Sequence, residues 1–201
     1  ESVRQLHAGM SRLRGRLAAL YRLLRLDHDG TAAEWAAALD GQLLPRLEPQ
    51  SPLIVAICGG GSSGKSTLFN TLIRENVSPV GGRAGMNRRL LLSLAPQQAR
   101  SRALMTLLTR VFGRPPAPMA ARDDVLSPGP PLYTTSSSMP PRIVLIDTPD
   151  FDTGAGGEYD NRDMARQALD AADVMVYIFT NSNYNNRDNT DFISQVLTGI
   201  G

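Results

Sequence analysis

The amino-acid sequence predicts an α/β fold in which a three-layer domain with a mostly parallel sheet follows an N-terminal helical extension. Short apolar runs at 52–58, 142–147 and 173–180 have the length and the β-branched content of buried strands. Stretches with helical periodicity separate these runs, and this alternation is typical of parallel βαβ units. The composition is that of a globular protein, because 42% of the 201 residues are apolar and 20% are charged.

Residues 1–50 are expected to form the helical extension. Leucines recur at helical spacing on one face of a basic helix predicted over 11–26. Thr31 and Glu34 have the spacing of a capping box and predict a second helix. Prolines at 45, 49 and 52 are expected to end that helix and to form a linker. The leucine face would pack on a neighbouring helix or contact a membrane or a partner, and the sequence leaves both interpretations open.

Residues 51–201 are expected to form the main domain. Its predicted elements beyond the three apolar runs are a strand over 88–94 and helices over 65–74, 101–114, 161–172 and 188–197. Eight prolines and several serines fall in 115–141, which is therefore predicted to be a mostly irregular, flexible insertion.

The segment 59–66 reads G-G-G-S-S-G-K-S, which has the spacing of a phosphate-binding loop between a strand and a helix. Small residues allow backbone N–H groups to wrap a phosphate closely, and glycine tolerates the positive φ values that the turn needs. Lys65 is the only lysine beside 20 arginines, and its compact ammonium suits the β- and γ-phosphates of a nucleotide. The Ser66 hydroxyl would bind Mg²⁺. The predicted phosphate cradle is Gly59, Gly60, Gly61, Ser62, Ser63, Gly64, Lys65 and Ser66.

A second motif supports this interpretation. Asp147 ends the buried run "RIVLID", at the tip of a strand that should neighbour the strand before the loop. A carboxylate at this place can hold Mg²⁺ through water. The alternative is that Asp147 caps a turn before Pro149, but the loop upstream favours the metal role.

"GGGSSGKSTLFN" together with "VLIDTP" resembles the GTPase class of P-loop proteins, in the translation-factor-related group that contains Era-like and dynamin-like GTPases. The resemblance covers about residues 53–200 and implies a P-loop NTPase, G-domain-like fold that binds GTP and Mg²⁺. It implies that Lys65 and Ser66 act in catalysis by positioning and charge neutralisation, that Thr67 lies near the α-phosphate, and that the Asp150 N–H faces the γ-phosphate. Residues 150–163 would be the second switch.

The sequence departs from this family pattern at four places. Asp150 replaces the switch glycine, Asn87 replaces the switch threonine, and Gly61 stands where dynamin-like proteins have a catalytic glutamine. No glutamine follows "DTPDFD", so slow intrinsic hydrolysis is expected. The base-reading motif N/T-K-x-D is also absent, because Lys65 is the only lysine, and the G domain is expected to be cut before it. The preference for guanine therefore follows from the resemblance alone.

Two other functions remain open: an ATP-dependent, kinase-like P-loop enzyme, and a nucleotide-bound scaffold with weak or no hydrolysis. The expected partners are a guanine nucleotide, a second copy of the chain across the nucleotide face, and a peripheral membrane contact. A net charge of +2 indicates no specific nucleic acid. A single cysteine, Cys58, and the lack of a signal-peptide core predict a cytoplasmic protein. The missing initiating Met predicts a processed or excised chain.

Overall fold

The computed structural model describes residues 2–25, 30–48, 51–81, 87–150, 158–181 and 194. The chain divides into two compact units, Glu1–Pro52 and Leu53–Gly201, which are described separately below. Apart from residue 194, the helix predicted over 188–197 lies outside the described residues.

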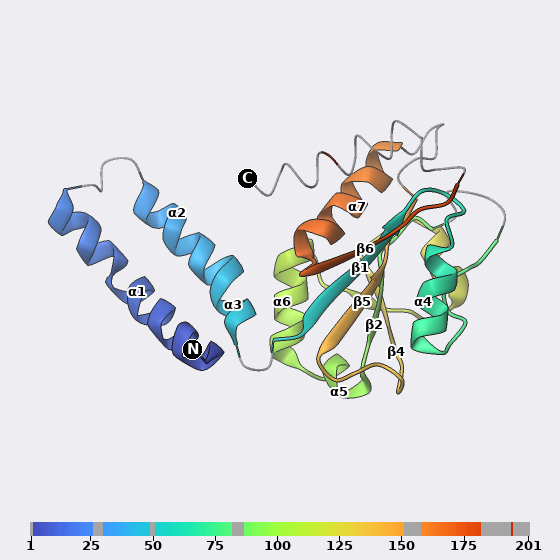
Figure 1. The fold of residues 1–201 in the computed structure, drawn as a ribbon, viewed down its shortest axis with the longest axis horizontal. Helices are drawn as coiled ribbons and strands as arrows, with labels where there is room; N and C mark the ends of the chain where they lie inside the picture. The colour runs from blue at the N-terminus through green and yellow to red at the C-terminus, as the bar shows by residue number, and fades with distance from the viewer. Residues whose placement is uncertain are drawn as a thin grey trace. The chain divides into compact units, whose positions relative to one another are not determined.

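The first unit is helical, with α1 (Val3–Leu24), α2 (Thr31–Ala38), a π-helical turn η1 (Leu39–Leu43) and α3 (Leu44–Leu47) (Figure 1). The first helix begins well before residue 11 because Ser2 and Gln5 form a capping box there. The predicted capping box at Thr31 is wrong: Gly30 is the N-cap, so the Thr31 hydroxyl is already inside the helix. Pro45 does not end the helix either, because it lies in the first turn of α3, where no intrahelical N–H bond is required of it.

The leucine face of α1 is only partly covered. Leu17 is buried at 8% exposure, whereas Leu13, Leu20 and Leu24 are 43–55% exposed. The Arg14 guanidinium donates to both carboxylate oxygens of Asp40 and ties α1 to η1, with a shortest distance of 2.6 Å. Among the described helices, none combines the length and the apolar character that crossing a bilayer requires.

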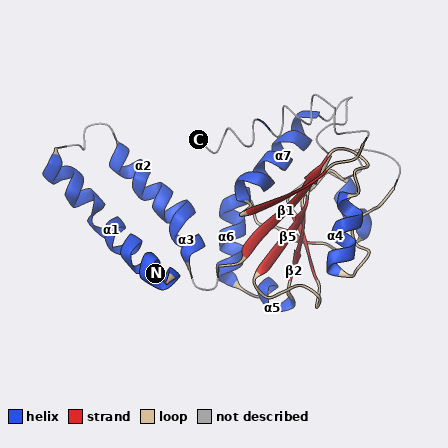
Figure 2. Ribbon diagram, in the orientation of Figure 1, coloured by secondary structure: helices blue, strands red, loops and turns tan. Residues whose placement is uncertain are grey.

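The second unit contains a six-stranded mixed sheet (Figure 2). Its strand order is β3 (Ala117–Pro118), β4 (Leu132–Thr135), β2 (Leu91–Leu94), β5 (Ile143–Asp147), β1 (Leu53–Gly59) and β6 (Val174–Ile178). Strand β1 is parallel to β5 and β6, and β2 is parallel to β4, but β2 runs antiparallel to β5. The sheet is therefore mostly parallel, as predicted, and the pair of β2 with β5 is its antiparallel part.

Helices cover both faces of this sheet (Figure 1). The α6 (Arg102–Phe112) and α7 (Glu158–Ala171) helices pack on one face, and α4 (Lys65–Ile73) lies on the other; a short helix α5 (Pro96–Ala99) precedes α6. Alternate residues of β1 serve the two layers, since Ala56 and Cys58 join the α6 and α7 layer while Ile57 packs with α4. Cys58 is fully buried, which raises the pKa of its thiol to about 12.

The segment 115–141 packs into the domain, although most of its residues lie outside helices and strands, as predicted. It supplies β3, a 3₁₀ turn η2 (Arg122–Leu126) and β4, and it buries Val125 and Leu132 in the same core cluster as Phe69. Prolines are compatible with this arrangement because β3 is at the sheet edge, where a missing N–H costs no ladder bond. The prediction of mostly irregular structure is confirmed, whereas the expectation of a flexible insertion did not foresee that the segment contributes to the core.

Candidate phosphate and metal site

The site lies where several strand ends meet. Parallel pairing places Ile57 opposite Asp147 and Gly59 opposite Ile178, so β1, β5 and β6 end at the same edge of the sheet. Strand β2 is antiparallel to β5 and pairs its first residue, Leu91, with Asp147. The segment that enters β2, including Asn87, therefore reaches this edge as well.

The loop after β1 turns sharply into α4. Gly59 has φ +154°, and a Cβ there would lie 2.6 Å from the backbone oxygen of Ile178. Gly64, the N-cap of α4, has φ +95°, and Ser62 has φ +56°. These positive φ values let the loop segment 60–64 turn back sharply, so that α4 begins at Lys65.

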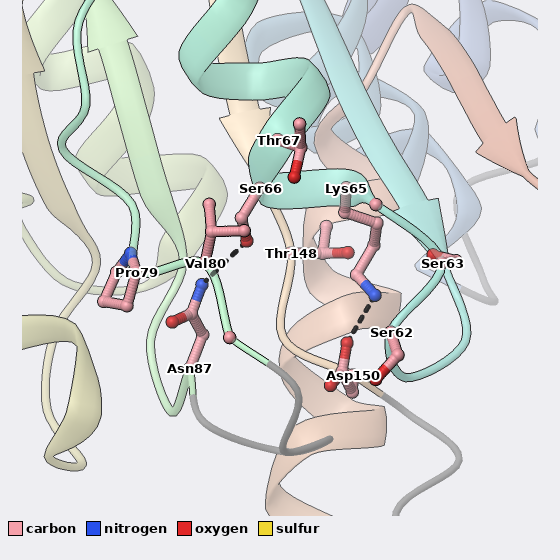
Figure 3. Close-up of a pocket in the computed structure, with 12 residues that line it drawn as sticks. Ser62, Ser63, Lys65, Ser66, Thr67, Pro79, Val80, Asn87, Thr148 and Asp150 are labelled. Carbon is pink, nitrogen blue, oxygen red and sulfur yellow. Dashed lines mark hydrogen bonds and ion pairs between the residues drawn. The ribbon is translucent and has the colours of Figure 1, made fainter.

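Lys65 is 4% exposed and makes two polar contacts, of which Figure 3 shows the one with Asp150. Its Nζ donates to the Gly60 carbonyl at 2.7 Å and forms an ion pair with the Asp150 carboxylate. Ser62 to Thr67 and Asp150 line one pocket, together with 79–81, Asn87 and Thr148. Gly59, Gly60 and Gly61 form the turn that leads from β1 into it.

Asp147 is 1% exposed and accepts three hydrogen bonds on its Oδ2 atom. The donors are Ser78 Oγ at 2.7 Å, Ser66 Oγ at 2.9 Å and Asn87 Nδ2 at 3.3 Å. Burial raises the pKa of Asp147 from its ordinary value of 3.8 to about 6, and the two serine hydroxyls oppose this shift. The Asp147–Ser66 pair predicted from the two motifs is thus in direct contact.

These residues have the chemistry of a divalent-cation site. Within the described part of the chain, Asp147 Oδ1 and Asn87 Oδ1 are buried oxygens without a hydrogen-bond partner. The Asn87 amide group also approaches Ser66 Oγ at 3.4 Å (Figure 3). Mg²⁺ binds carboxylate, amide and hydroxyl oxygens, and an unpartnered buried oxygen is costly unless a ligand satisfies it. Ser66 and Asp147 therefore fit Mg²⁺, whereas the Asn87 amide turns its nitrogen towards both of them and would have to rotate to offer Oδ1 to the same cation.

Sequence reasoning missed the residues that position Asp147. Ser78 is fully buried, and its backbone N–H and carbonyl are both bonded by the Asn70 side chain, at 2.9 and 2.8 Å. Arg122 also donates to the Ser78 carbonyl at 3.2 Å. An asparagine inside α4 was a usable signal, because its helix propensity is low and its side chain often bonds nearby backbone. Nothing in the sequence marked Ser78.

Thr148 links the ends of the neighbouring strands β5 and β1 at the pocket. Its N–H and its hydroxyl both donate to the Ile57 carbonyl, at 3.3 and 2.9 Å. It follows Asp147 directly and so fixes the end of β5 against β1. Residues 82–86 lie outside the described residues, and so does 151–157, which is half of the expected second switch.

The fold and the motifs together define a P-loop GTPase domain. The family model of the dynamin family matches residues 55–200, and the chain belongs to the dynamin family. No curated protein matched the chain in a search of such proteins.

Two similar solved structures are of Era. One is Era in complex with MgGDPNP and nucleotides 1506–1542 of 16S ribosomal RNA, at 18% identity and a TM-score of 0.47, covering 76% of this chain and 38% of that chain. The other is an Era variant from Aquifex aeolicus bound to GDP and AlF4−, at 19% identity and a TM-score of 0.45, covering 74% and 37%. The chain thus spans less than two fifths of either structure's chain.

Proposed function

We propose that this chain binds Mg·GTP in the pocket between the phosphate loop and Asp147, and that it hydrolyses the terminal phosphate with water. The contact between Ser66 Oγ and Asp147 Oδ2 at 2.9 Å carries the proposal. It joins the first turn of the helix after the loop to the tip of the neighbouring strand, next to the only lysine of the chain. Membership of the dynamin family supports guanine as the base.

Each residue has a role that its position supports. The Lys65 ammonium would pair with the β- and γ-phosphate oxygens, and the N-terminal end of α4 would add its positive dipole end. Ser66 and Asp147 would hold the metal. Bound Mg²⁺ supplies neutralisation of the charge on the phosphates. The chain itself positions the nucleotide, and positioning together with electrostatic stabilisation accounts for most of the catalysis in this reaction class.

Intrinsic hydrolysis should be slow. Gly61 has no side chain that could orient the attacking water, and the Asp150 carboxylate forms an ion pair with the Lys65 ammonium. We propose that a second copy of the chain, meeting the first across the nucleotide face, supplies the missing groups. This predicts that GTP turnover per chain rises with protein concentration. Turnover that stays near zero at every concentration, with intact binding, would instead support a nucleotide-bound scaffold.

The test of binding is calorimetry on the 201-residue chain with Mg·GTP. Lys65→Ala should lower the affinity at least about a hundredfold, because the ammonium pairs with two phosphates. Arg102→Ala, which removes an exposed cation from α6, is the matched control and should leave affinity unchanged. Unchanged affinity of the Lys65 variant would overturn the site. Equal displacement of GTP by ATP would favour an ATP-using enzyme.

A further inference from the structure

The ion pair between Lys65 and Asp150 occupies the centre of the candidate site. The two side chains are 4% and 15% exposed, so water does little to screen the pair. The same ammonium donates to the Gly60 carbonyl, which holds it inside the loop. Without a ligand, a carboxylate of the chain itself is thus the anionic partner of the phosphate-loop lysine.

A nucleotide and Asp150 would compete for this ammonium. Carboxylate and phosphate oxygens are both anionic acceptors that an ammonium binds at hydrogen-bond distance. Asp150 also lines the same pocket as Ser62 to Thr67, where the phosphates would lie. When the phosphates of a nucleotide bind, the Asp150 carboxylate either moves away from Lys65 or stays beside another negative charge in a poorly screened site.

We propose that Asp150 is an internal competitor of the phosphates and that it sets the nucleotide preference of the site, weakening the binding of a triphosphate more than that of a diphosphate. The inference rests on the proposed function, because it assumes that phosphates bind at Lys65. A triphosphate carries more negative charge into the pocket than a diphosphate does. The repulsion from a retained carboxylate, or the cost of displacing it, is therefore larger for the triphosphate.

The experiment measures the affinity of the full chain for Mg·GDP and for Mg·GTPγS, a slowly hydrolysed triphosphate, after removal of bound nucleotide. Asp150→Asn removes the charge and keeps the size, and Asp150→Gly removes the whole side chain. Asp150→Glu keeps the carboxylate. Asp170→Asn is the matched charge control, because Asp170 is exposed in the last turn of α7. That helix leads into the first residue of β6, at the end of the strands away from the site.

We expect the Asn and Gly variants to bind GTPγS about tenfold more tightly or better, and GDP only about threefold more tightly. The Glu variant and the Asp170 control should keep the wild-type ratio of the two affinities. Triphosphate binding that appears only in the Asn or Gly variant would support the inference too. A wild-type ratio in both of these variants, or weaker triphosphate binding, would overturn it while leaving the proposed function intact. Loss of all nucleotide binding in every chain would overturn both.

Discussion

Acidification should stabilise the metal-free protein through Asp147. The carboxyl is 1% exposed and its pKa is raised from 3.8 to about 6, chiefly by burial. The folded state therefore binds a proton more readily than the unfolded state does. The stabilising contribution is fully present below about pH 3.8 and is lost as the pH rises through 6. Its full size is about 3 kcal/mol, and about 2 kcal/mol should be present at pH 4.5.

The assay is urea unfolding of the wild type and of Asp147→Asn in buffers without divalent metal, between about pH 4.5 and pH 8. Other groups also titrate in this range, so the informative quantity is the wild-type free energy of unfolding minus that of the variant. Far-UV circular dichroism is the suitable probe. The only tryptophan, Trp35, belongs to the other compact unit, so its fluorescence is not a probe placed in the unit that contains Asp147.

We expect this difference to shift by about 2 kcal/mol in favour of the wild type from pH 8 to pH 4.5. Mg·GTP should show the opposite trend, because a metal requires the ionised carboxylate, and wild-type affinity should fall below about pH 6. Parallel stability curves for the two chains would refute the reasoning, since they would show that burial does not perturb this carboxyl.

Two further substitutions test how the site is built. Ser78→Ala removes the hydroxyl that donates to Asp147, and a hydrogen bond to a charged group contributes about 1.5–3 kcal/mol. The Mg²⁺ concentration that half-saturates GTP binding should therefore rise about tenfold. An unchanged Mg²⁺ titration would exclude this role for Ser78. Gly59→Ala should lower the free energy of unfolding by at least about 2 kcal/mol, because its Cβ would meet the Ile178 backbone oxygen. The control is Gly113→Ala, which is also at positive φ but in open space and should lower the free energy of unfolding by about 1 kcal/mol. Equal losses of the two variants in urea unfolding would contradict the steric argument.

The elements that the sequence predicted well are those whose local pattern and buried environment agree. The apolar run before the loop and the run ending at Asp147 are strands, and a helix begins at Lys65. A buried parallel strand has to be apolar on both faces, so its run of residues is nearly unbroken and easily seen. The phosphate loop is equally visible, because its turn needs glycine at Gly59, where a Cβ would collide, and at Gly64, where φ is positive.

What the sequence could not show depends on pairing between distant segments. The antiparallel direction of β2 has no local signature, yet it brings Asn87 beside Asp147. The role of Ser78 depends on Asn70, eight residues earlier, and on a carboxylate 69 residues later. The prolines in 115–141 indicated an irregular backbone correctly, but they could not show that Val125 is buried, because that depends on a core formed with the rest of the domain.

The charges of the pocket link metal and nucleotide binding. Two carboxylates, Asp147 and Asp150, share this region with a single lysine, and only Asp150 is paired with it. If a nucleotide displaces Asp150 from Lys65, the pocket holds two uncompensated carboxylates beside the phosphates. A divalent cation at Asp147 offsets one of them and also satisfies the unpartnered Oδ1 atom of Asp147. Nucleotide affinity should therefore depend strongly on Mg²⁺, and this dependence should weaken in Asp150→Asn, where one of the opposing charges has been removed.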